Sequence, residues 1–292
     1  METSLVKSDS VDRSDMHLRG WKADWYAFLA MVRKEIIAMS RYPVQFVTSF
    51  AQIFLIIAIF SLAGLMFASG DGGEYNPTTS GVPAYGFLLF IMISDTLWVI
   101  GVNLRHEQMQ GTLEQLYLSP ANKFASLVSR VTTLVLWTGS MAVIGTLLMQ
   151  TFLGRLPFEN PGLALLILFF SLTGSFGVGF LFAALTLRLK GTAETLANLA
   201  QFAMMVLCAN FFPFSALPQA VRYISMVIPL SYCVDAFRST LMGFPPGFPE
   251  LAPIEVEVPI VIVFGILMPI LGYWLYRNAE DHARKVGSLA EF

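Results

Sequence analysis

Long apolar stretches separated by short polar segments are the main pattern along this chain. A helix needs about 20 apolar residues to cross the roughly 30 Å hydrocarbon core of a bilayer. Five stretches reach that length, namely residues 44–68, 82–104, 131–153, 162–187 and 258–276. A sixth stretch, residues 193–214, is also long enough, although it contains Glu194, Asn198, Gln201 and Asn210. The pattern predicts an all-α, polytopic membrane protein with six transmembrane helices.

The composition supports the same class. Hydrophobic residues make up 55% of the 292 residues, charged residues only 13%, and the mean hydropathy is +0.65. Soluble domains carry about 25% charged residues, so we expect an integral membrane protein. The net charge of -2 argues against a nucleic-acid partner, because no excess of basic residues is available to neutralise phosphates. Cys208 and Cys233 show no metal-binding spacing and are interpreted as small buried residues rather than a disulfide.

Lysine and arginine are distributed unevenly between the two sides of the predicted membrane. If the N-terminus is cytoplasmic, all but three of the 18 basic residues fall in cytoplasmic segments, and the exceptions are Arg155, Arg222 and Arg238. Cytoplasmic loops of membrane proteins are rich in these residues. We therefore expect a multi-pass protein of the plasma (inner) membrane with both termini in the cytoplasm. The first 43 residues hold no apolar run long enough for a secretory signal, so the N-terminus is expected to be retained.

Residues 21–42 have the pattern of an amphipathic helix. Apolar side chains recur there at steps of three and four: Trp21, Trp25, Phe28, Leu29, Val32, Ile36 and Met39. Asp24, Arg33 and Lys34 fall on other faces of the same helix. Tryptophan favours the headgroup zone, and Pro43 ends or bends the helix where the chain enters the membrane. The pattern predicts an interfacial helix, and taken alone it describes a simple membrane anchor.

Polar residues inside the predicted spans are few. Asp95 is the one acid well inside an apolar run. An ionisable group at such depth usually faces the bundle interior or water, so Asp95 is a candidate for a translocation path. A hydrogen bond to a neighbouring helix or a second subunit explains it equally well. The same two alternatives hold for Asn198, Gln201 and Met205, which share one face of the span 193–214.

The span 162–187 also carries a stripe of small residues. Ser171, Ser175, Gly179 and Ala183 recur every four residues. Small side chains let two membrane helices approach closely. The stripe is therefore interpreted as structural and predicts close helix packing.

Residues 105–120 form the only strongly polar stretch between two long spans. From Glu107 to Pro120 the order is E-x-x-x-G-T-L-E-x-L-x-x-S-P. A short helix is predicted here, in which Gly111 permits close approach of another backbone and Ser119-Pro120 ends the helix. Taken alone, the stretch also fits a solvated loop. Its order resembles the cytoplasmic coupling segment of ABC-2 type transporter permeases.

A second resemblance to the same family lies after the fifth predicted span. It consists, in order, of Phe212-Pro213, Leu217-Pro218, Pro229-Leu230-Ser231-Tyr232, Asp235, Arg238 and Gly243. The resemblance implies that residues 211–243 form a re-entrant helical hairpin before the last span; an amphipathic loop lying flat on the outer surface is the alternative. Its functional residues would be Pro213, Pro218, Pro229, Tyr232, Asp235 and Arg238. Asp235 and Arg238 are three positions apart, which lets them pair on one helix.

Together the two resemblances imply the membrane subunit of an ABC exporter of the drug and lipid export branch. The implied substrate is hydrophobic or amphipathic, and the implied partners are an ABC ATP-binding subunit, a second permease copy in a homodimer, and membrane lipids. ATP and Mg would be bound by the partner subunit, and this chain would hold no cofactor. Coupling to the ATPase would use Glu107, Gly111, Thr112, Leu113, Glu114, Ser119 and Pro120. The interfacial helix would also contact the ATPase, through Trp21, Trp25, Arg33, Lys34 and Glu35.

The sequence shows no pattern for catalysis or metal binding. It contains no GxxxxGK[ST] or GxSxG motif, and His17, His106 and His282 are scattered. Energy would therefore come from a partner. The alternatives are a secondary transporter that uses Asp95 as an ion or proton carrier and works without an ATPase, and a membrane scaffold without transport activity. The predicted organisation is a cytoplasmic tail at 1–20, the interfacial helix at 21–42, the transmembrane domain at 43–276 and a cytoplasmic tail at 277–292.

Overall fold

The computed structural model describes residues 81–96, 157–189 and 193–286, together with single helical positions between residues 25 and 59 and at 139, 140 and 144. All regular structure in these residues is helical, which confirms the predicted all-α class for the described part. Two of its helices are long and apolar enough to cross a membrane. The segment 105–120, and Trp21, Lys34 and Glu35, lie outside the described residues.

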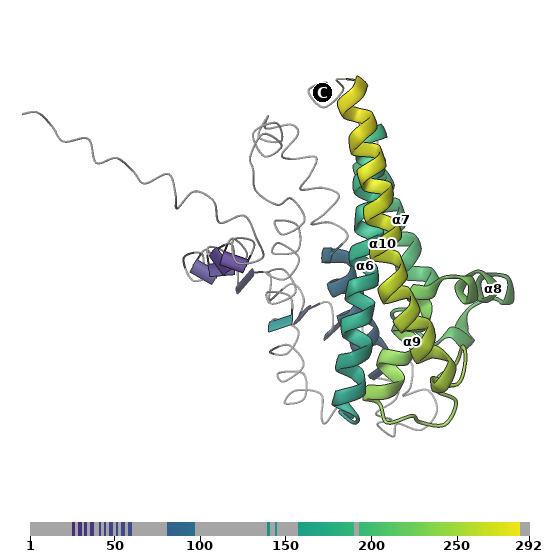
Figure 1. Ribbon diagram of the computed structural model, residues 1–292. Coiled ribbons are helices and arrows are strands. Elements are labelled where there is room, and N and C mark those ends of the chain that lie inside the picture. The colour runs from purple at the N-terminus through teal and green to yellow at the C-terminus, as the bar shows by residue number, and fades with distance from the viewer. Residues whose placement is uncertain are drawn as a thin grey trace, which may run out of the picture.

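Two long helices run side by side through the molecule (Figure 1). They are α6, Pro161–Leu189, and α10, Ile254–Val286. Both run in the same direction, because contacts advance along the two chains together: the ring of Phe264 lies beside Gly174, and the rings of Tyr273 and Tyr276 beside Phe180. Helix α10 continues ten residues beyond the predicted end of the last span, into the segment expected to be a tail.

Glycine sets the distance between α6 and α10. A Cβ atom at Gly177 would clash with the backbone of Met268 and Pro269, and one at Gly272 with the carbonyl oxygen of Gly177. The predicted stripe of small residues on α6 is buried along its whole length, as a packing role requires. Gly174 and Gly177, which lie outside the four-residue stripe, also lie tight against α10, since a Cβ atom there would clash with the Phe264 ring or with the Met268 and Pro269 backbone.

Helix α7, Ala193–Leu207, is shorter than the predicted span 193–214. Its 15 residues cover about 22 Å at 1.5 Å per residue, which is less than the hydrocarbon thickness. The helix ends because the Asn210 side chain donates hydrogen bonds to the carbonyls of Met204 and Met205, at 3.0 and 3.3 Å. Ala209 then takes a left-handed conformation, with φ of 47°, and turns the chain. Asn210, which the hydropathy pattern places inside a span, is thus the residue that stops the helix.

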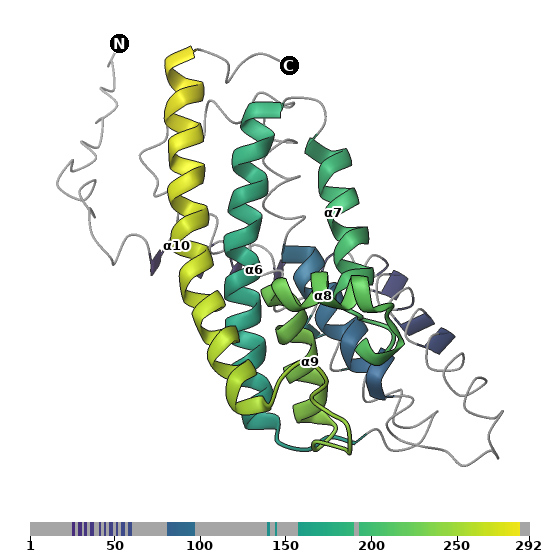
Figure 2. The same cartoon turned by 90° about the vertical axis from the view of Figure 1, so that its right-hand side faces the viewer.

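The chain continues as a broken pair of helices. After the short 3-10 helix η3, Phe214–Ala216, come α8, Gln219–Val227, and α9, Pro229–Leu241, which meet at an angle of 96°. Pro229 occupies the first turn of α9, where its missing N–H costs nothing. In Figure 1 α8 projects from the bundle, whereas α9 runs along α6 and α10. Figure 2 shows α7 covering one half of the bundle's length and α9 the other half.

The helix Gly81–Thr96 packs against the turn that follows α7. The rings of Phe87 and Phe211 lie 5.3 Å apart, and a Cβ atom at Gly86 would clash with the carbonyl oxygen of Asn210. The Tyr85 hydroxyl donates to the carbonyl of Pro157. This helix therefore fixes both the α7 turn and the segment that leads into α6.

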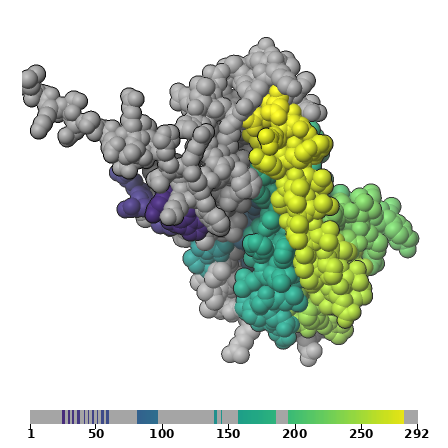
Figure 3. Space-filling view, in the orientation of Figure 1, coloured from purple at the N-terminus to yellow at the C-terminus, as the bar shows by residue number. Residues whose placement is uncertain are grey.

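Large apolar side chains cover much of the outside of the molecule. Figure 3 shows α10 as a continuous ridge on one face, and its outward residues include Val263, Ile266, Ile270 and Trp274. Soluble monomers rarely expose such contiguous apolar surface, whereas hydrocarbon chains of lipid cover it without cost. The described part therefore has the surface of a membrane-embedded protein. At the N-terminal side, Trp25 and Arg33 are helical and exposed.

Candidate functional site

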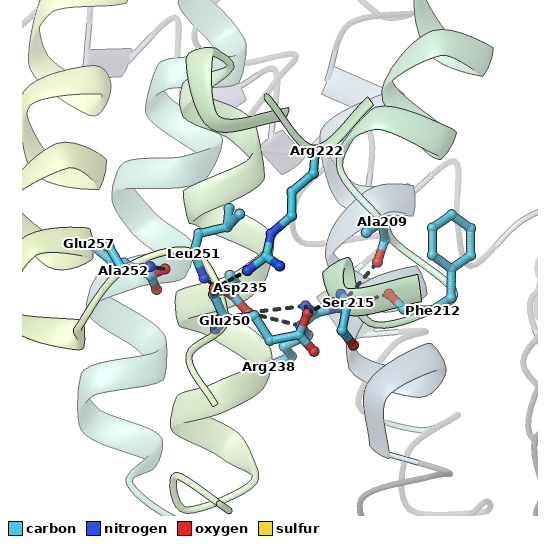
Figure 4. A network of polar contacts seen from close by, with 10 residues as sticks. All are labelled: Ala209, Phe212, Ser215, Arg222, Asp235, Arg238, Glu250, Leu251, Ala252 and Glu257. Carbon is cyan, nitrogen blue, oxygen red and sulfur yellow. Dashed lines mark hydrogen bonds and ion pairs between the residues drawn. The ribbon is translucent and has the colours of Figure 1, made fainter. Parts of the chain in front are cut away.

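Arg238 lies at the centre of a buried polar network between α9 and two loops (Figure 4). Its side chain is fully buried. Nε and Nη2 donate to Oδ1 of Asp235, at 3.2 and 3.0 Å, and Nη1 donates to the carbonyls of Ala209 and Phe212, both at 3.1 Å. The guanidinium therefore joins α9 to the non-helical backbone that follows α7.

Two aromatic rings shield this guanidinium from solvent and lipid. The ring of Phe214 lies 4.9 Å from the guanidinium carbon and that of Phe248 lies 5.4 Å from it, within the range of cation–π attraction. A buried charge is costly unless it is paired and fully hydrogen-bonded. Arg238 is paired with Asp235 and donates four hydrogen bonds, which offsets much of this cost and explains how a cation can occupy the interior of an apolar bundle.

Asp235 binds the loop that precedes α10. Its Oδ2 accepts hydrogen bonds from the backbone N–H groups of Glu250 and Leu251, at 2.7 and 2.8 Å, while Oδ1 faces Arg238. The carboxylate is fully buried and accepts from donors on both of its oxygens. One side chain thus holds the start of α10 against α9.

Glu250 closes the network on the side of α8. Its Oε2 accepts from the backbone N–H of Ser215 at 2.8 Å and lies 4.0 Å from Nη2 of Arg238. Arg222 of α8 donates to the carbonyl of Glu250 at 3.0 Å. Burial raises the pKa of the Glu250 carboxyl above its ordinary value, and the positive charge of Arg238 partly opposes that rise. Glu250 therefore ties η3, α8 and α9 to one loop.

Glu257, in the first turn of α10, is the last residue of this group of polar side chains. It is fully buried, and its Oε1 accepts from the backbone N–H of Ala252 at 3.2 Å. We call Arg222, Asp235, Arg238, Glu250 and Glu257, with the backbone groups that they bind, the Arg238 network. The network can hold charge and position backbone. Among the described residues no three His, Cys, Asp or Glu side chains are grouped so as to hold a metal ion.

The structure brings together the residues predicted for the region 211–243. Pro213 and Pro218 precede η3 and α8, and the Tyr232 hydroxyl donates to the carbonyl of Met226 at 2.8 Å across the bend between α8 and α9. The predicted pairing of Asp235 with Arg238 is confirmed. Their connection to the loop before α10 is new information that the sequence pattern did not contain.

Sequence reasoning missed Glu250 and Glu257. Glu250 lies in a stretch of Pro and Gly that reads as an exposed loop, and Glu257 lies at the polar edge of an apolar span. The only signal was that three acids, Glu250, Glu255 and Glu257, precede the last span with no basic residue among them. That signal does not identify a partner, since the partner is on α9.

The predicted path residues lie elsewhere in the bundle. Asp95 is half-buried near the end of the described helix Gly81–Thr96, and Asn198, Gln201 and Met205 are half-buried on α7. The opposite face of α7 exposes Leu199, Phe202 and Val206. Helix α7 therefore has an apolar outer face and a more polar, partly covered face.

The fold and this network define an all-helical integral membrane protein whose last apolar helix is anchored by a buried ionic network. The family model for ABC-2 type transporters matches residues 26–242. Because the match covers most of the chain, the protein belongs to the ABC-2 type transporter family. No curated protein matches the chain.

Membership has two direct consequences. ABC-2 permeases are membrane components of transport systems and are not themselves catalytic, and the family normally works with an ABC ATP-binding subunit. The matched region includes Asp235 and Arg238 but ends at residue 242. Glu250 and Glu257 therefore lie beyond the part of the chain that the family model describes.

Proposed function

We propose that this chain is the transmembrane permease subunit of an ATP-driven ABC exporter that moves a hydrophobic or amphipathic substrate, such as a drug or lipid, out across the plasma (inner) membrane. The observation that carries the proposal is the family match over residues 26–242. The apolar outer surface of α6, α7 and α10 supports a position within lipid. ATP hydrolysis, with ATP and Mg, would take place on a separate subunit.

The arrangement of α6 and α10 supports cytoplasmic termini. The two helices run in the same direction, so their C-terminal ends lie at one end of the bundle (Figure 2). Basic residues cluster in the sequence at these two ends: Arg188, Lys190, Arg277, Arg284 and Lys285. Cytoplasmic ends of spans are enriched in basic residues. The Arg238 network would then belong to the outer half of the membrane.

A re-entrant role for α8 and α9 is supported by the geometry of the break. Non-helical backbone within a membrane is tolerated where protein covers it and satisfies its polar groups. The carbonyls of Ala209 and Phe212, which follow the end of α7, receive hydrogen bonds from Arg238. The 96° bend between α8 and α9 turns the chain within the same region. We take α8 and α9 as the re-entrant pair in the outer leaflet.

Substrate would move along the less apolar face of α7. Asn198, Gln201 and Met205 lie on this half-buried face, and mixed polar and flexible apolar groups suit an amphipathic molecule. Asp95 is a further candidate for the path. A second permease copy would provide the opposite wall.

The partner ATPase would dock on the cytoplasmic segment 105–120 and on the interfacial helix. The contact residues would be Glu107, Gly111, Thr112, Leu113, Glu114, Ser119 and Pro120, with Trp21, Trp25, Arg33, Lys34 and Glu35 from the helix. Binding of ATP would draw two ATPase subunits together and move both permeases.

To test the proposed export function, the chain is reconstituted with its cognate ATP-binding subunit in proteoliposomes. ATP-dependent export of a lipophilic dye, abolished when the ATPase cannot hydrolyse ATP, is the expected result. Gly111→Trp and Glu114→Lys should weaken co-purification of the ATPase and stop export, because a bulky side chain blocks backbone approach and a reversed charge repels a basic partner. Thr79→Lys, in the predicted outer loop, is the control and should leave both unchanged. Export driven by a proton gradient with this chain alone would instead establish the secondary transporter.

A further inference from the structure

The two arginines of the Arg238 network differ in how their guanidinium groups are bound. Arg238 donates four hydrogen bonds and is paired with Asp235. Arg222 donates one hydrogen bond, to the carbonyl of Glu250, and its Nε is buried without an acceptor. Within the described part of the chain, no ion pair joins Arg222 to a carboxylate. Because a guanidinium has several N–H donors, Arg222 keeps most of its capacity to bind an anion.

The acids closest to Arg222 in the network are bound to other groups. Asp235 accepts hydrogen bonds from Arg238 and from two backbone N–H groups. Oε2 of Glu250 accepts from the backbone N–H of Ser215 and faces Arg238. Arg222 is half-buried, and a charge that is withdrawn from water is unfavourable unless it is paired. An anion from outside the chain would supply the missing partner.

The Arg222 guanidinium lies at the edge of the predicted hydrocarbon layer. Exposed apolar side chains follow α10 from Val256 to Leu275, a rise of about 30 Å, which matches the thickness of that layer. One edge of the layer therefore lies near Val256, close to the start of α10 at Ile254. Figure 4 shows the Arg222 side chain extending from α8 toward the loop before α10, where it donates to Glu250. Long basic side chains reach lipid headgroups in this way.

Helix α8 exposes an apolar surface beside this guanidinium. Tyr223, Ile224 and Val227 are 68%, 53% and 81% exposed, although all three are large and mostly apolar. Helix α8 projects from the bundle alongside the N-terminal half of α10 (Figures 1 and 2). Water would not favour such a surface, whereas acyl chains would cover it. A cation and an apolar surface on one short helix match the two parts of a phospholipid.

We propose that Arg222 and the exposed face of α8 form a binding site for one phospholipid. The guanidinium binds the phosphate, whose oxygens suit its planar set of donors, and the acyl chains lie against Tyr223, Ile224 and Val227. The bound phosphate is the counter-ion that the chain itself does not provide for Arg222. Placement in the outer leaflet rests on the proposed function, but the site itself requires neither an ATPase nor transport.

Native mass spectrometry of the purified full-length protein tests the site, with phosphatidylglycerol added in steps from detergent solution. The unchanged protein should bind one phosphatidylglycerol per chain more tightly than any further lipid. Arg222→Gln should bind this first lipid at least about tenfold more weakly, because a hydrogen-bonded charge contact is lost. Arg222→Lys keeps the charge without the planar set of donors, and its affinity should lie between the two. Gln219→Ala, on an exposed residue of the same helix, is the matched control and should bind as the unchanged protein does.

Two further ligands separate the phosphate from the rest of the lipid. Diacylglycerol with the same acyl chains lacks the phosphate, so Arg222→Gln should not change its binding. Inorganic phosphate lacks the chains and should not displace phosphatidylglycerol at millimolar concentration. The double variant Ile224→Ser and Val227→Ser should weaken the first phosphatidylglycerol, and its unfolding midpoint should stay unchanged because both side chains are exposed.

Four results would overturn the proposal. Equal binding of the first phosphatidylglycerol by Arg222→Gln and the unchanged protein would exclude Arg222, and an equal loss of diacylglycerol would exclude the phosphate. Displacement by inorganic phosphate would assign the site to a free anion. Loss of a dimer from the mass spectrum of the double variant, with the bound lipid unchanged, would assign the face of α8 to a second copy of the chain. None of these measurements depends on export, so a failure of the proposed transport function would be seen separately.

Discussion

Two regions of the molecule hold the same part of the chain by different interactions. One is the helix pair of α6 and α10, and the other is the Arg238 network. The helix pair is held by close apolar packing, which small residues such as Gly177 and Gly272 permit. The network is held by a buried ion pair, Asp235 with Arg238, and by hydrogen bonds from these charges to backbone in other segments, such as the Ala209 carbonyl. Packing fails when a side chain is too large, whereas the network fails when a partner is missing. The two regions therefore respond to different substitutions.

The largest effect should come from Arg238→Leu. It leaves Asp235 buried without a cation and removes the donors to Ala209 and Phe212. Breaking a buried ion pair by removing one partner costs about 3 to 5 kcal/mol. We expect a large fall in the unfolding midpoint of the purified protein in nanodiscs. Arg222→Leu, which removes a single contact on a half-buried residue, should cost much less. An equal fall of the unfolding midpoint in the two variants would show that Arg238 contributes no more to the network than Arg222 does.

The helix pair is tested by Gly177→Leu. The new side chain would collide with the backbone of Met268 and Pro269 on α10, and overpacking typically costs about 1 to 3 kcal/mol. Gly162→Leu is the matched control on the same helix, because no atom lies within 4 Å of a Cβ atom there. The unfolding midpoint should fall for Gly177→Leu and stay unchanged for Gly162→Leu. Tolerance of leucine at both positions would mean that α6 and α10 separate easily.

Asn210→Ala changes the end of α7, where the helix gives way to the backbone that the Arg238 network binds. Its side chain donates to the carbonyls of Met204 and Met205 at the end of α7, and a lost hydrogen bond of this kind costs about 1 kcal/mol. Hydrogen exchange of the last turn of α7 should become faster, while exchange in α10 stays unchanged. Gln219→Ala, on an exposed residue, is the control. Unchanged exchange in α7 would indicate that the turn alone ends the helix.

The smallest effect concerns the pH dependence of Glu250. Burial raises the pKa of this carboxyl in the folded protein, so the folded state binds the proton more tightly than the unfolded chain. The free energy of unfolding should therefore fall as pH rises from the ordinary carboxyl pKa through the raised one. Glu250→Gln should remove this fall. The exposed Glu255→Gln should retain it, and a steeper fall in Glu250→Gln would contradict the expected direction.

Sequence reasoning predicted the helix pair better than the network. The spans 162–187 and 258–276 correspond to α6 and α10, because a helix in lipid satisfies its own backbone and needs only length and apolarity. The span 193–214 was wrong in length, since α7 ends at Leu207. The polar atoms of Asn210 act on the backbone next to it, and a hydropathy average does not include such bonds.

The sequence by itself determined the class of the protein, the positions of α6 and α10 and the local pairing of Asp235 with Arg238, because each depends on residues that are close together along the chain. The tertiary structure alone decided that Arg238 binds the carbonyls after α7, that Asp235 holds the loop before α10, and that the Glu250 carboxylate lies 4.0 Å from Arg238. These contacts join residues that the helices bring together across the bundle. Their energy comes from the exclusion of solvent, which exists only after the helices have packed.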